Sequence, residues 1–360
     1  MARQLGVAPS TVGLHVDQLI RASVLKEAVS VDGSRGRPPT LLELNPAAGQ
    51  FVGVDFDARA MFATSVDFAQ QPLESHRDMI RHDDSADNVL RRMAAIVARV
   101  ADPARPILGI GAAVPGVVDA ARGIGLNYRF IRGWRDVPVV SALSDRFDVP
   151  VELENNIRAM ALAERLFDQG RETENFVCIG VRSGIGSGLV IDGRLYRGPD
   201  GKAGELGSWP CRAADGREMR TLEEVASLRA ILNDLTAAVR AGERTSLVLH
   251  RKRVTVESLL DAVRSADRLT LRVLKRAATS LGRAVAQISV LLNPRRIVIA
   301  GPLADAGDAW LGPLSETVEE LLSPAYASMP LVELSTLGAN AGAMGAAALA
   351  VNRWKFLPVE

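Results

Sequence analysis

Two stretches of the chain show the same pattern of apolar strands on either side of a short turn. Phe51–Phe68 has an apolar strand, a turn at residues 55–59 and a second apolar strand, and Cys178–Ser208 has a glycine-rich turn at residues 183–188. Alternation around a tight turn predicts a β-hairpin. Because the two hairpins lie roughly a domain apart, they predict a duplicated fold with one hairpin opening each half.

The remainder of the chain alternates apolar strands with segments of helical periodicity, which predicts an α/β fold. We expect further strands at 106–114, 149–153 and 296–300, and helices at 85–100, 140–147, 157–167, 228–241, 255–266, 269–292 and 341–354. The basic, polar stretch at 244–254 is expected to be a solvated connection. We divide the chain into 1–45, 46–170 and 171–340, with a C-terminal helix at about 341–357 packing back on the middle unit.

Residues 1–45 differ in pattern from the rest and predict a small module. A helix is expected to start near Pro9, with four apolar residues at helical spacing on one face (Val12, Val16, Leu19 and Ile20). Strands are expected at 24–31 and 40–44. This layout is typical of a winged helix-turn-helix, whose second helix enters the DNA major groove.

Five residues of this module are the predicted DNA contacts: Ser10, Thr11, His15, Arg35 and Arg37. The two arginines sit on a proline-stiffened segment that suits a minor groove or a phosphate track. A small helical cap with a linker is the alternative interpretation. Since the chain begins inside what would be the second of three helices, we expect the DNA affinity of the chain as given to be impaired.

Composition narrows the class of protein. The net charge is +1, and 48% hydrophobic with 24% charged residues is typical of a globular protein. Two cysteines give no disulfide framework, and no apolar run of about 18 residues or signal segment is present. We therefore expect a cytoplasmic protein with no membrane partner.

Short motifs add to the two hairpins: GIG and PGVVD within 109–119, ENN at 154–156, GELG at 204–207, LE at 222–223 and GANAGAMGA at 338–346. Together they resemble the ROK family of repressors, open reading frames and sugar kinases, from about Phe51 to the C-terminus. The resemblance implies a duplicated actin-like, ribonuclease-H-like sugar-kinase fold, here preceded by the winged module. It also implies a homodimer or homotetramer.

The resemblance assigns a sugar site. Its residues would be Gly116, Asn127, Asn155, Asn156, Glu205, Ser208 and Glu223. Amides and carboxylates from several loops can satisfy sugar hydroxyls, each of which is both donor and acceptor. The alternative interpretations are a helix cap for Asn156, a turn for Asn127 and solvated carboxylates for Glu205 and Glu223.

Catalytic residues of the family are replaced. Its catalytic aspartate falls at Asn156, and an amide cannot accept the substrate proton. Its phosphate-binding Asp-x-Gly-x-Thr pattern falls on residues 55–59, where Asp57 would repel phosphates and Arg59 would partly offset that charge. We predict no catalytic residue, no cofactor and no enzyme activity.

A metal site is not expected either. The zinc segment of the family falls on residues 214–221, which hold no cysteine, and its histidine is Ser208. Structural zinc needs three or four such ligands. The sequence thus predicts a transcription regulator that acts as a repressor. It would bind DNA and also a sugar or a sugar phosphate. The alternatives are a sugar kinase and a sugar sensor that no longer binds DNA.

Overall fold

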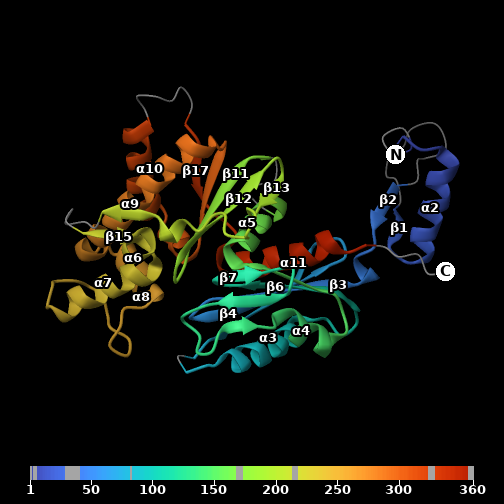
Figure 1. Ribbon diagram of the computed structural model, residues 1–360, viewed down its shortest axis with the longest axis horizontal. Coiled ribbons are helices and arrows are strands. Elements are labelled where there is room, and N and C mark those ends of the chain that lie inside the picture. Colours follow the sequence, from blue (N-terminus) through green and yellow to red (C-terminus); the bar gives the residue numbers. More distant parts are fainter. Residues whose placement is uncertain are drawn as a thin grey trace.

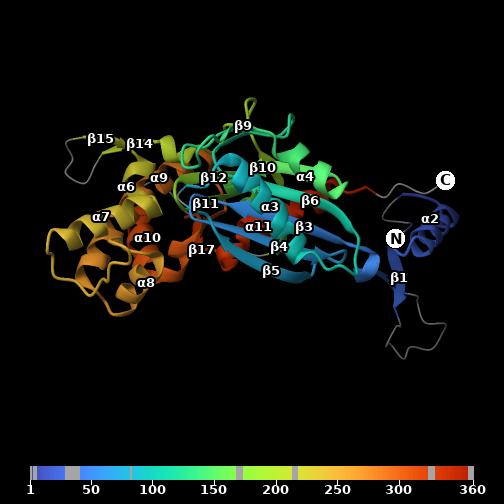
Figure 2. The same ribbon diagram turned by 90° about the horizontal axis from the view of Figure 1, so that it is seen from below.

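The computed structural model describes residues 2, 6–28, 41–81, 83–167, 173–212, 218–322 and 329–355. Two α/β halves lie side by side, and a small N-terminal module sits against the first half at the end of the molecule opposite α7 and α8 (Figure 1, Figure 2). Within these residues no helix combines the length and the apolar character that a membrane crossing requires.

The first half is built on a five-stranded sheet in the order β10-β6-β3-β4-β5. Its strands are β3 (Gln50–Phe56), β4 (Ala60–Asp67), β5 (Pro72–Met79), β6 (Ile107–Val114) and β10 (Val151–Asn155). β3 pairs antiparallel with β4 and parallel with β6. β3 and β4 are buried along their whole length, because α3 (Ala86–Val100) and α4 (Val139–Phe147) cover one face and α11 (Ala341–Arg353) the other.

The second half repeats this plan with the order β13-β12-β11-β16-β17. Its strands are β11 (Phe176–Val181), β12 (Ile185–Ile191), β13 (Arg194–Tyr196), β16 (Arg296–Ala300) and β17 (Leu331–Leu334). In the first sheet β3 forms a hairpin with β4 and runs parallel to β6. In the second sheet β11 likewise forms a hairpin with β12 and runs parallel to β16. The predicted duplicated α/β fold is therefore confirmed.

Several helices pack around the second sheet; the ones expected at 157–167, 228–241, 255–266 and 269–292 are present, and the one at 308–322 was not predicted. They are α5 (Asn156–Phe167), α6 (Leu222–Ala226), α7 (Leu228–Arg240), α8 (Val256–Arg264), α9 (Arg268–Leu292) and α10 (Asp308–Leu322). α9 ends where Asn293 adopts a left-handed φ of 45°. The capping box predicted from Thr221 and Glu224 is present at the start of α6.

Two small sheets accompany the two main ones. One contains β7 (Val117–Asp119), β8 (Ile124–Asn127) and β9 (Arg135–Val137). The other contains β14 (Pro210–Arg212) and β15 (Met219–Thr221).

The last helix approaches the backbone of the first sheet very closely at two glycines. A Cβ placed on Gly53 would come within 1.9 Å of the Ala343 carbonyl oxygen, and one on Gly111 within 1.7 Å of that of Ala346. On the other side of α11, Gly345 meets the backbone of α5 equally closely. The small residues predicted at the start of this helix thus permit direct backbone contact.

The glycine-rich segment of the second hairpin differs from the prediction. β12 already begins at Ile185, so Gly186 and Gly188 belong to the strand and not to the turn. A Cβ on Gly188 would lie 2.4 Å from the Cβ of Ala161 in α5. These glycines leave room for α5 to pack on the hairpin.

The N-terminal module contains α2 (Pro9–Arg21), β1 (Leu25–Ala28) and β2 (Leu41–Leu44), with β1 and β2 antiparallel. Three of the predicted DNA contacts, Ser10, Thr11 and His15, are exposed on α2. The other two, Arg35 and Arg37, fall at 29–40, outside the described residues, as does the predicted wing turn.

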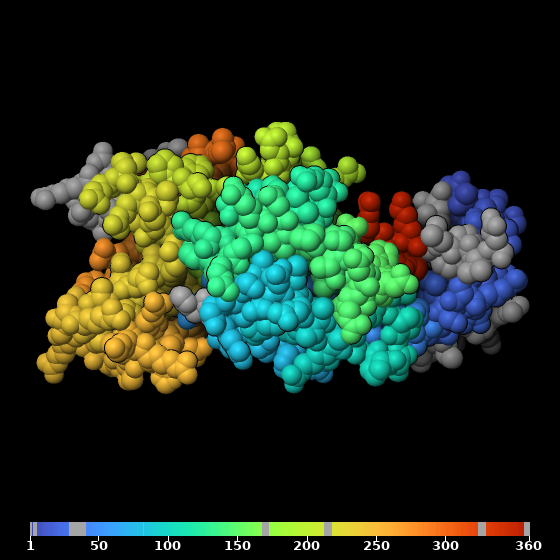
Figure 3. Space-filling model, turned by 60° about the horizontal axis from the view of Figure 1, so that its bottom comes forward, coloured from blue at the N-terminus to red at the C-terminus, as the bar shows by residue number. Residues whose placement is uncertain are grey.

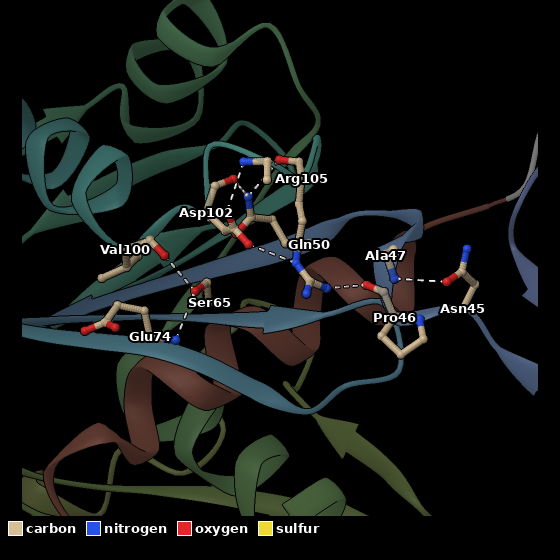
Figure 4. Close-up of polar contacts among 10 residues, drawn as sticks. Asn45, Pro46, Ala47, Gln50, Ser65, Glu74, Val100, Asp102 and Arg105 are labelled. Carbon is tan, nitrogen blue, oxygen red and sulfur yellow. Dashed lines mark hydrogen bonds and ion pairs between the residues drawn. The ribbon is translucent and has the colours of Figure 1, made fainter.

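A polar junction fixes the module to the first half (Figure 4). The Asn45 amide donates to the Ser23 carbonyl at 2.7 Å, and the Arg105 guanidinium donates to the Pro46 carbonyl at 2.6 Å. Gln50 is buried and donates to the carbonyls of Asp102 and Arg105. The chain between β2 and β3 is therefore tied at both ends.

An apolar cluster completes the junction. Trp354, just after α11, stands edge-on to Phe68 and Phe51, with ring centroids 4.9 and 6.5 Å away. Val24 and Leu19 of the N-terminal module pack in the same cluster. The end of α11 therefore contacts both the first sheet and the N-terminal module.

Candidate functional site

A cavity of about 480 Å³ lies between the two halves. Its lining includes all seven of the residues predicted to bind sugar: Gly116, Asn127, Asn155, Asn156, Glu205, Ser208 and Glu223. They come from both halves and from five separate segments of the chain. Because ligands of α/β folds bind at the carboxyl ends of strands, this is the position expected for a binding site.

Asn155 and Asn156 follow directly on strand β10 and have different roles. The Asn155 side chain accepts from the backbone N–H groups of Ile157 and Arg158 at 2.9 and 3.2 Å, and donates to the Gly116 carbonyl at 2.9 Å. Asn155 therefore caps α5, the role that the sequence had suggested as an alternative for Asn156. Asn156 instead donates to the Phe56 carbonyl at 3.2 Å.

Gly116 and Asn127 are adjacent through their backbones. Gly116 has a φ of 78°, and a Cβ there would lie 2.1 Å from the Asn127 carbonyl oxygen. A side chain at residue 116 would push away the loop that carries Asn127. Gly116 thus shapes the cavity, and Asn127 is exposed at its mouth.

Glu223 is held by two arginines and is not freely solvated. Its carboxylate accepts from Arg129 at 2.7 Å and lies 3.5 Å from Arg229. Both guanidinium groups also stack on the ring of Phe130, at 4.8 and 4.7 Å from its centroid. A Cβ on Gly184 would come within 2.3 Å of this carboxylate, which explains the glycine at that point of the turn.

Glu205 lines the same cavity, and although its side chain is partly exposed, its pKa is raised because its surroundings disfavour the charged form, with Arg158 opposing the rise and Glu223 adding to it. Arg158 is buried and pairs with Glu154 at 3.0 Å. Its guanidinium also donates to the Gly201 carbonyl at 2.7 Å. This buried pair positions the wall behind Glu205. Ser208, which replaces the histidine of the family motif, is exposed nearby.

The floor of the cavity contains a buried ion-pair cluster that the sequence did not reveal. Arg182, from the second half, pairs with Asp55 at 2.7 Å and with Asp57 at 3.4 Å, both from the first hairpin. Burial raises the pKa of the Asp55 carboxyl from 3.8 to about 7, while Arg182 opposes that rise and Asp57 adds to it. Arg182 therefore offsets the negative charge of Asp57. The sequence had suggested Arg59 for this role.

Charges of both signs balance in the lining of this cavity. The acidic residues that line it are Asp57, Glu205 and Glu223, and the basic ones are Arg129, Arg158 and Arg182. Two of the arginines pair with two of the acids inside the cavity itself. A neutral, hydroxyl-rich ligand suits such a lining better than a charged one.

Metal ligands do not gather in the part of the chain that the structure describes. There, no three histidine, cysteine, aspartate or glutamate side chains form a group able to hold a metal ion. Residues 214–217, half of the segment 214–221 at the zinc position of the family, lie outside that part.

Known proteins match most of the chain. The ROK family model matches residues 51–353. The xylose repressor of Caldicellulosiruptor bescii is 25% identical over 95% of this chain and 88% of its own length. The glucokinase of Thermotoga maritima is 30% identical over 74% of this chain and 86% of its own length.

A solved structure also matches most of the chain. A ROK family transcriptional regulator described as a homologue of the Escherichia coli MLC protein superposes with a TM-score of 0.76 at 26% identity, covering 98% of this chain and 90% of that one. Repressors match over nearly the whole chain, including the N-terminal module, while the glucokinase matches about three quarters of it. The chain belongs to the ROK family.

Proposed function

We propose that this protein is a sugar-responsive transcription regulator, a repressor that binds DNA through its N-terminal module and an uncharged sugar in the cavity between its halves. The observation that carries this proposal is the cavity itself. Amides and carboxylates from both halves converge there, while the cavity floor is closed by an internal ion-pair cluster.

A neutral sugar is favoured over a sugar phosphate by the charges around Asn156. That residue donates to the backbone of the first hairpin and lies beside Asp55, Asp57 and Arg182. With two acids and one base, this cluster cannot present net positive charge to a phosphate. Sugar hydroxyls can instead pair with the free hydrogen-bonding capacity of Asn156, Glu205 and Asn127.

Loss of kinase activity follows from the same cluster. Phosphoryl transfer needs a carboxylate that accepts the hydroxyl proton, and residue 156 is an amide. It also needs space and donors for phosphate at the first hairpin turn, where Asp57 instead accepts from the backbone N–H groups of Arg59 and Ala60. We infer that the protein holds its sugar without changing it.

DNA binding is proposed for the exposed face of α2. Ser10, Thr11 and His15 project from the first half of this helix, where a recognition helix reads base edges. The match of repressors over this module supports the assignment. A homodimer or homotetramer would present two such helices to a two-fold operator.

Calorimetry and gel-shift experiments test this proposal. We expect one or more neutral sugars to bind the full chain, to alter its affinity for DNA flanking its own gene, and to be recovered unphosphorylated after incubation with Mg·ATP. Sugar phosphates should bind at least about tenfold more weakly than the free sugar.

Sugar kinase activity is the second candidate, because a glucokinase is among the relatives at 30% identity. ATP-dependent phosphorylation of the bound sugar well above background would establish it and overturn our proposal. In that event the proton acceptor must be a group other than Asn156, since an amide at that position contributes no base.

A further inference from the structure

We propose that Arg129 gates the sugar cavity: its side chain bridges the two halves at the rim, and a sugar enters or leaves only while this bridge is broken. The inference rests on the proposed function, because it takes the ligand of the cavity to be a sugar. It gives a residue outside the predicted sugar contacts control over the rates of binding.

The bridge joins residues of different halves. Arg129 and Phe130 lie in the loop after β8 of the first half, while Glu223 and Arg229 lie in α6 and α7 of the second half. Arg129 donates to the Glu223 carboxylate at 2.7 Å, and the Arg229 guanidinium lies over the Phe130 ring, 4.7 Å from its centroid. In Figure 3 the blue-green surface of the first half meets the yellow surface over α6 and α7. An ion pair and a cation–π contact therefore hold the halves together here.

The bridge lies on the solvent side of the cavity. The side chain of Arg129 is 63% exposed and that of Glu223 is 25% exposed, whereas that of Arg182 at the cavity floor is 7% exposed. All three residues line the same cavity. The ion pair between Arg129 and Glu223 thus borders the entrance of the cavity and not its interior.

Glu223 is held in place by its own half. Its Oε2 accepts the backbone N–H of Ile185 at 3.4 Å, and a Cβ on Gly184 or Gly207 would lie only 2.3 or 3.3 Å from the same oxygen. The guanidinium of Arg229 lies 3.5 Å from the carboxylate. Because all of these neighbours belong to the second half, Glu223 keeps its position when Arg129 leaves.

The loop that carries Arg129 is anchored to the first half. The backbone N–H of Tyr128 donates to the Trp134 carbonyl at 3.2 Å and closes the base of the loop. Trp134 is buried, and its ring centroid lies 4.8 Å from that of Phe56 in β3. The loop therefore moves with the first half, and breaking the bridge parts the two halves at the rim.

The exposure of the bridge gives it a distinctive dependence on salt. An exposed ion pair is weak and is screened by dissolved ions, so higher ionic strength favours the open rim. The diffusion of an uncharged molecule has no such dependence, because there is no charge for the field of the protein to steer. A rate of entry that rises with salt for an uncharged molecule therefore reports the opening of the bridge.

Alkylation of a thiol inside the cavity tests the gate without a sugar. Ser187 lines the cavity and is 5% exposed, so the variant S187C/C211S places a thiol there, while the remaining Cys178 is buried. Uncharged iodoacetamide is the probe. Adding R129A should speed alkylation about two- to fivefold. Raising NaCl from about 0.02 to about 0.5 M should speed alkylation in S187C/C211S but not after R129A is added.

Two further variants and one correction complete this experiment. R122A removes an exposed arginine of the turn between β7 and β8 and should leave the rate unchanged. R129K keeps the charge but loses the fork of donors, so its rate should lie between those of the parent and R129A. Rates are compared per thiolate, whose fraction follows from the pH dependence of alkylation. No change in R129A, or an equal rise in R122A, would overturn the proposal.

Stopped-flow binding of D-glucose, or of the first neutral sugar that calorimetry shows to bind, separates gating from contact. For a gate, R129A raises the association and dissociation rate constants by similar factors and leaves Kd within about twofold of the parent. A weaker Kd with unchanged association would make Arg129 a sugar contact. A tighter Kd with unchanged dissociation would make it a competitor for Glu223. Either result overturns the gate.

The two experiments also distinguish this proposal from the proposed function. If no neutral sugar binds, the proposed function fails, and the alkylation rates alone decide whether Arg129 controls access to the cavity. If a sugar binds but R129A changes neither the alkylation rate nor the two rate constants, the gate fails and the proposed function stands.

Discussion

The guanidinium of Arg182 lies 2.7 Å from the carboxylate of Asp55, although the two residues are 127 positions apart and belong to different halves. Both side chains are buried. The pair joins strand β11 of the second sheet to strand β3 of the first at the base of the opening. It therefore acts on two properties together, the stability of the interface between the halves and the charge at the floor of the sugar cavity.

Removing Arg182 should destabilise the protein strongly. Arg182→Ala leaves Asp55 and Asp57 buried beside each other without a cation, so we expect the free energy of unfolding to fall by ~3–5 kcal/mol at pH 8. Urea denaturation followed by circular dichroism measures this change.

The double variant D55N/R182A provides the control. Neutralising Asp55 removes one of the two unpaired charges and should recover part of the loss, as a double-mutant cycle would show. A loss below about 1 kcal/mol in Arg182→Ala would mean that the ion pair contributes little.

Stability should depend on pH through Asp55. Burial raises the pKa of this carboxyl from 3.8 to about 7 in the folded protein, so the folded state binds its proton more tightly than the unfolded state. That contribution is fully present below about pH 4 and is lost as the pH rises through 7.

The variant Asp55→Asn isolates this contribution. From pH 5 to pH 8 the stability of the parent relative to Asp55→Asn should decrease, by at most ~1.4 kcal/mol per pH unit. Chemical denaturation of both proteins across this range measures the difference. A difference that stays constant would show that Asp55 does not titrate there.

Sugar binding should depend on Glu205. Replacing its carboxylate by an amide in Glu205→Gln keeps the size but weakens its hydrogen bonds to sugar hydroxyls, so sugar affinity should drop about tenfold with little change in stability. Isothermal titration with a sugar found by thermal-shift screening measures it. Glu218→Gln, an exposed carboxylate outside the cavity, is the matched control, and equal losses in both variants would exclude a specific contact.

DNA recognition should depend on Thr11 and His15. We propose that these exposed side chains of α2 contact base edges, so Thr11→Ala or His15→Ala should cost ~1–3 kcal/mol in operator affinity. Fluorescence anisotropy with operator and scrambled duplexes measures the affinity. Glu43→Gln in β2 serves as a control away from that helix, and an equal effect of all three variants on both duplexes would contradict base readout.

Much of the fold follows from local pattern. The hairpins, the helix boundaries at Asn293 and at the capping box of Thr221, and the close packing of the small-residue C-terminal helix were all predictable, because each depends on neighbours in sequence. The convergence of the seven cavity residues was predictable through the family motifs. Their roles in binding remain predictions.

The arginines were not predictable in the same way. Arg182 sits at the end of a hairpin strand whose sequence contains no signal for its partner, because that partner lies in the other half. Residues 244–254 looked like a solvated connection, yet Leu247 and Val254 are buried and Arg251 and Arg253 line a cavity. Charged residues have no periodicity that distinguishes a solvated face from a concave one.

The bare contact between α11 and the first sheet has a mechanical consequence. With backbone against backbone at Gly53 and Gly111, a shift of the helix along the sheet would bring its side chains against the strand backbone at both points. Trp354 at its far end touches the same cluster as Leu19 and Val24. Helix α11 is therefore a continuous contact that runs from the backbone of α5 and the first sheet to the N-terminal module, and a shift of the elements around the cavity would be felt at α2, the proposed DNA-binding helix.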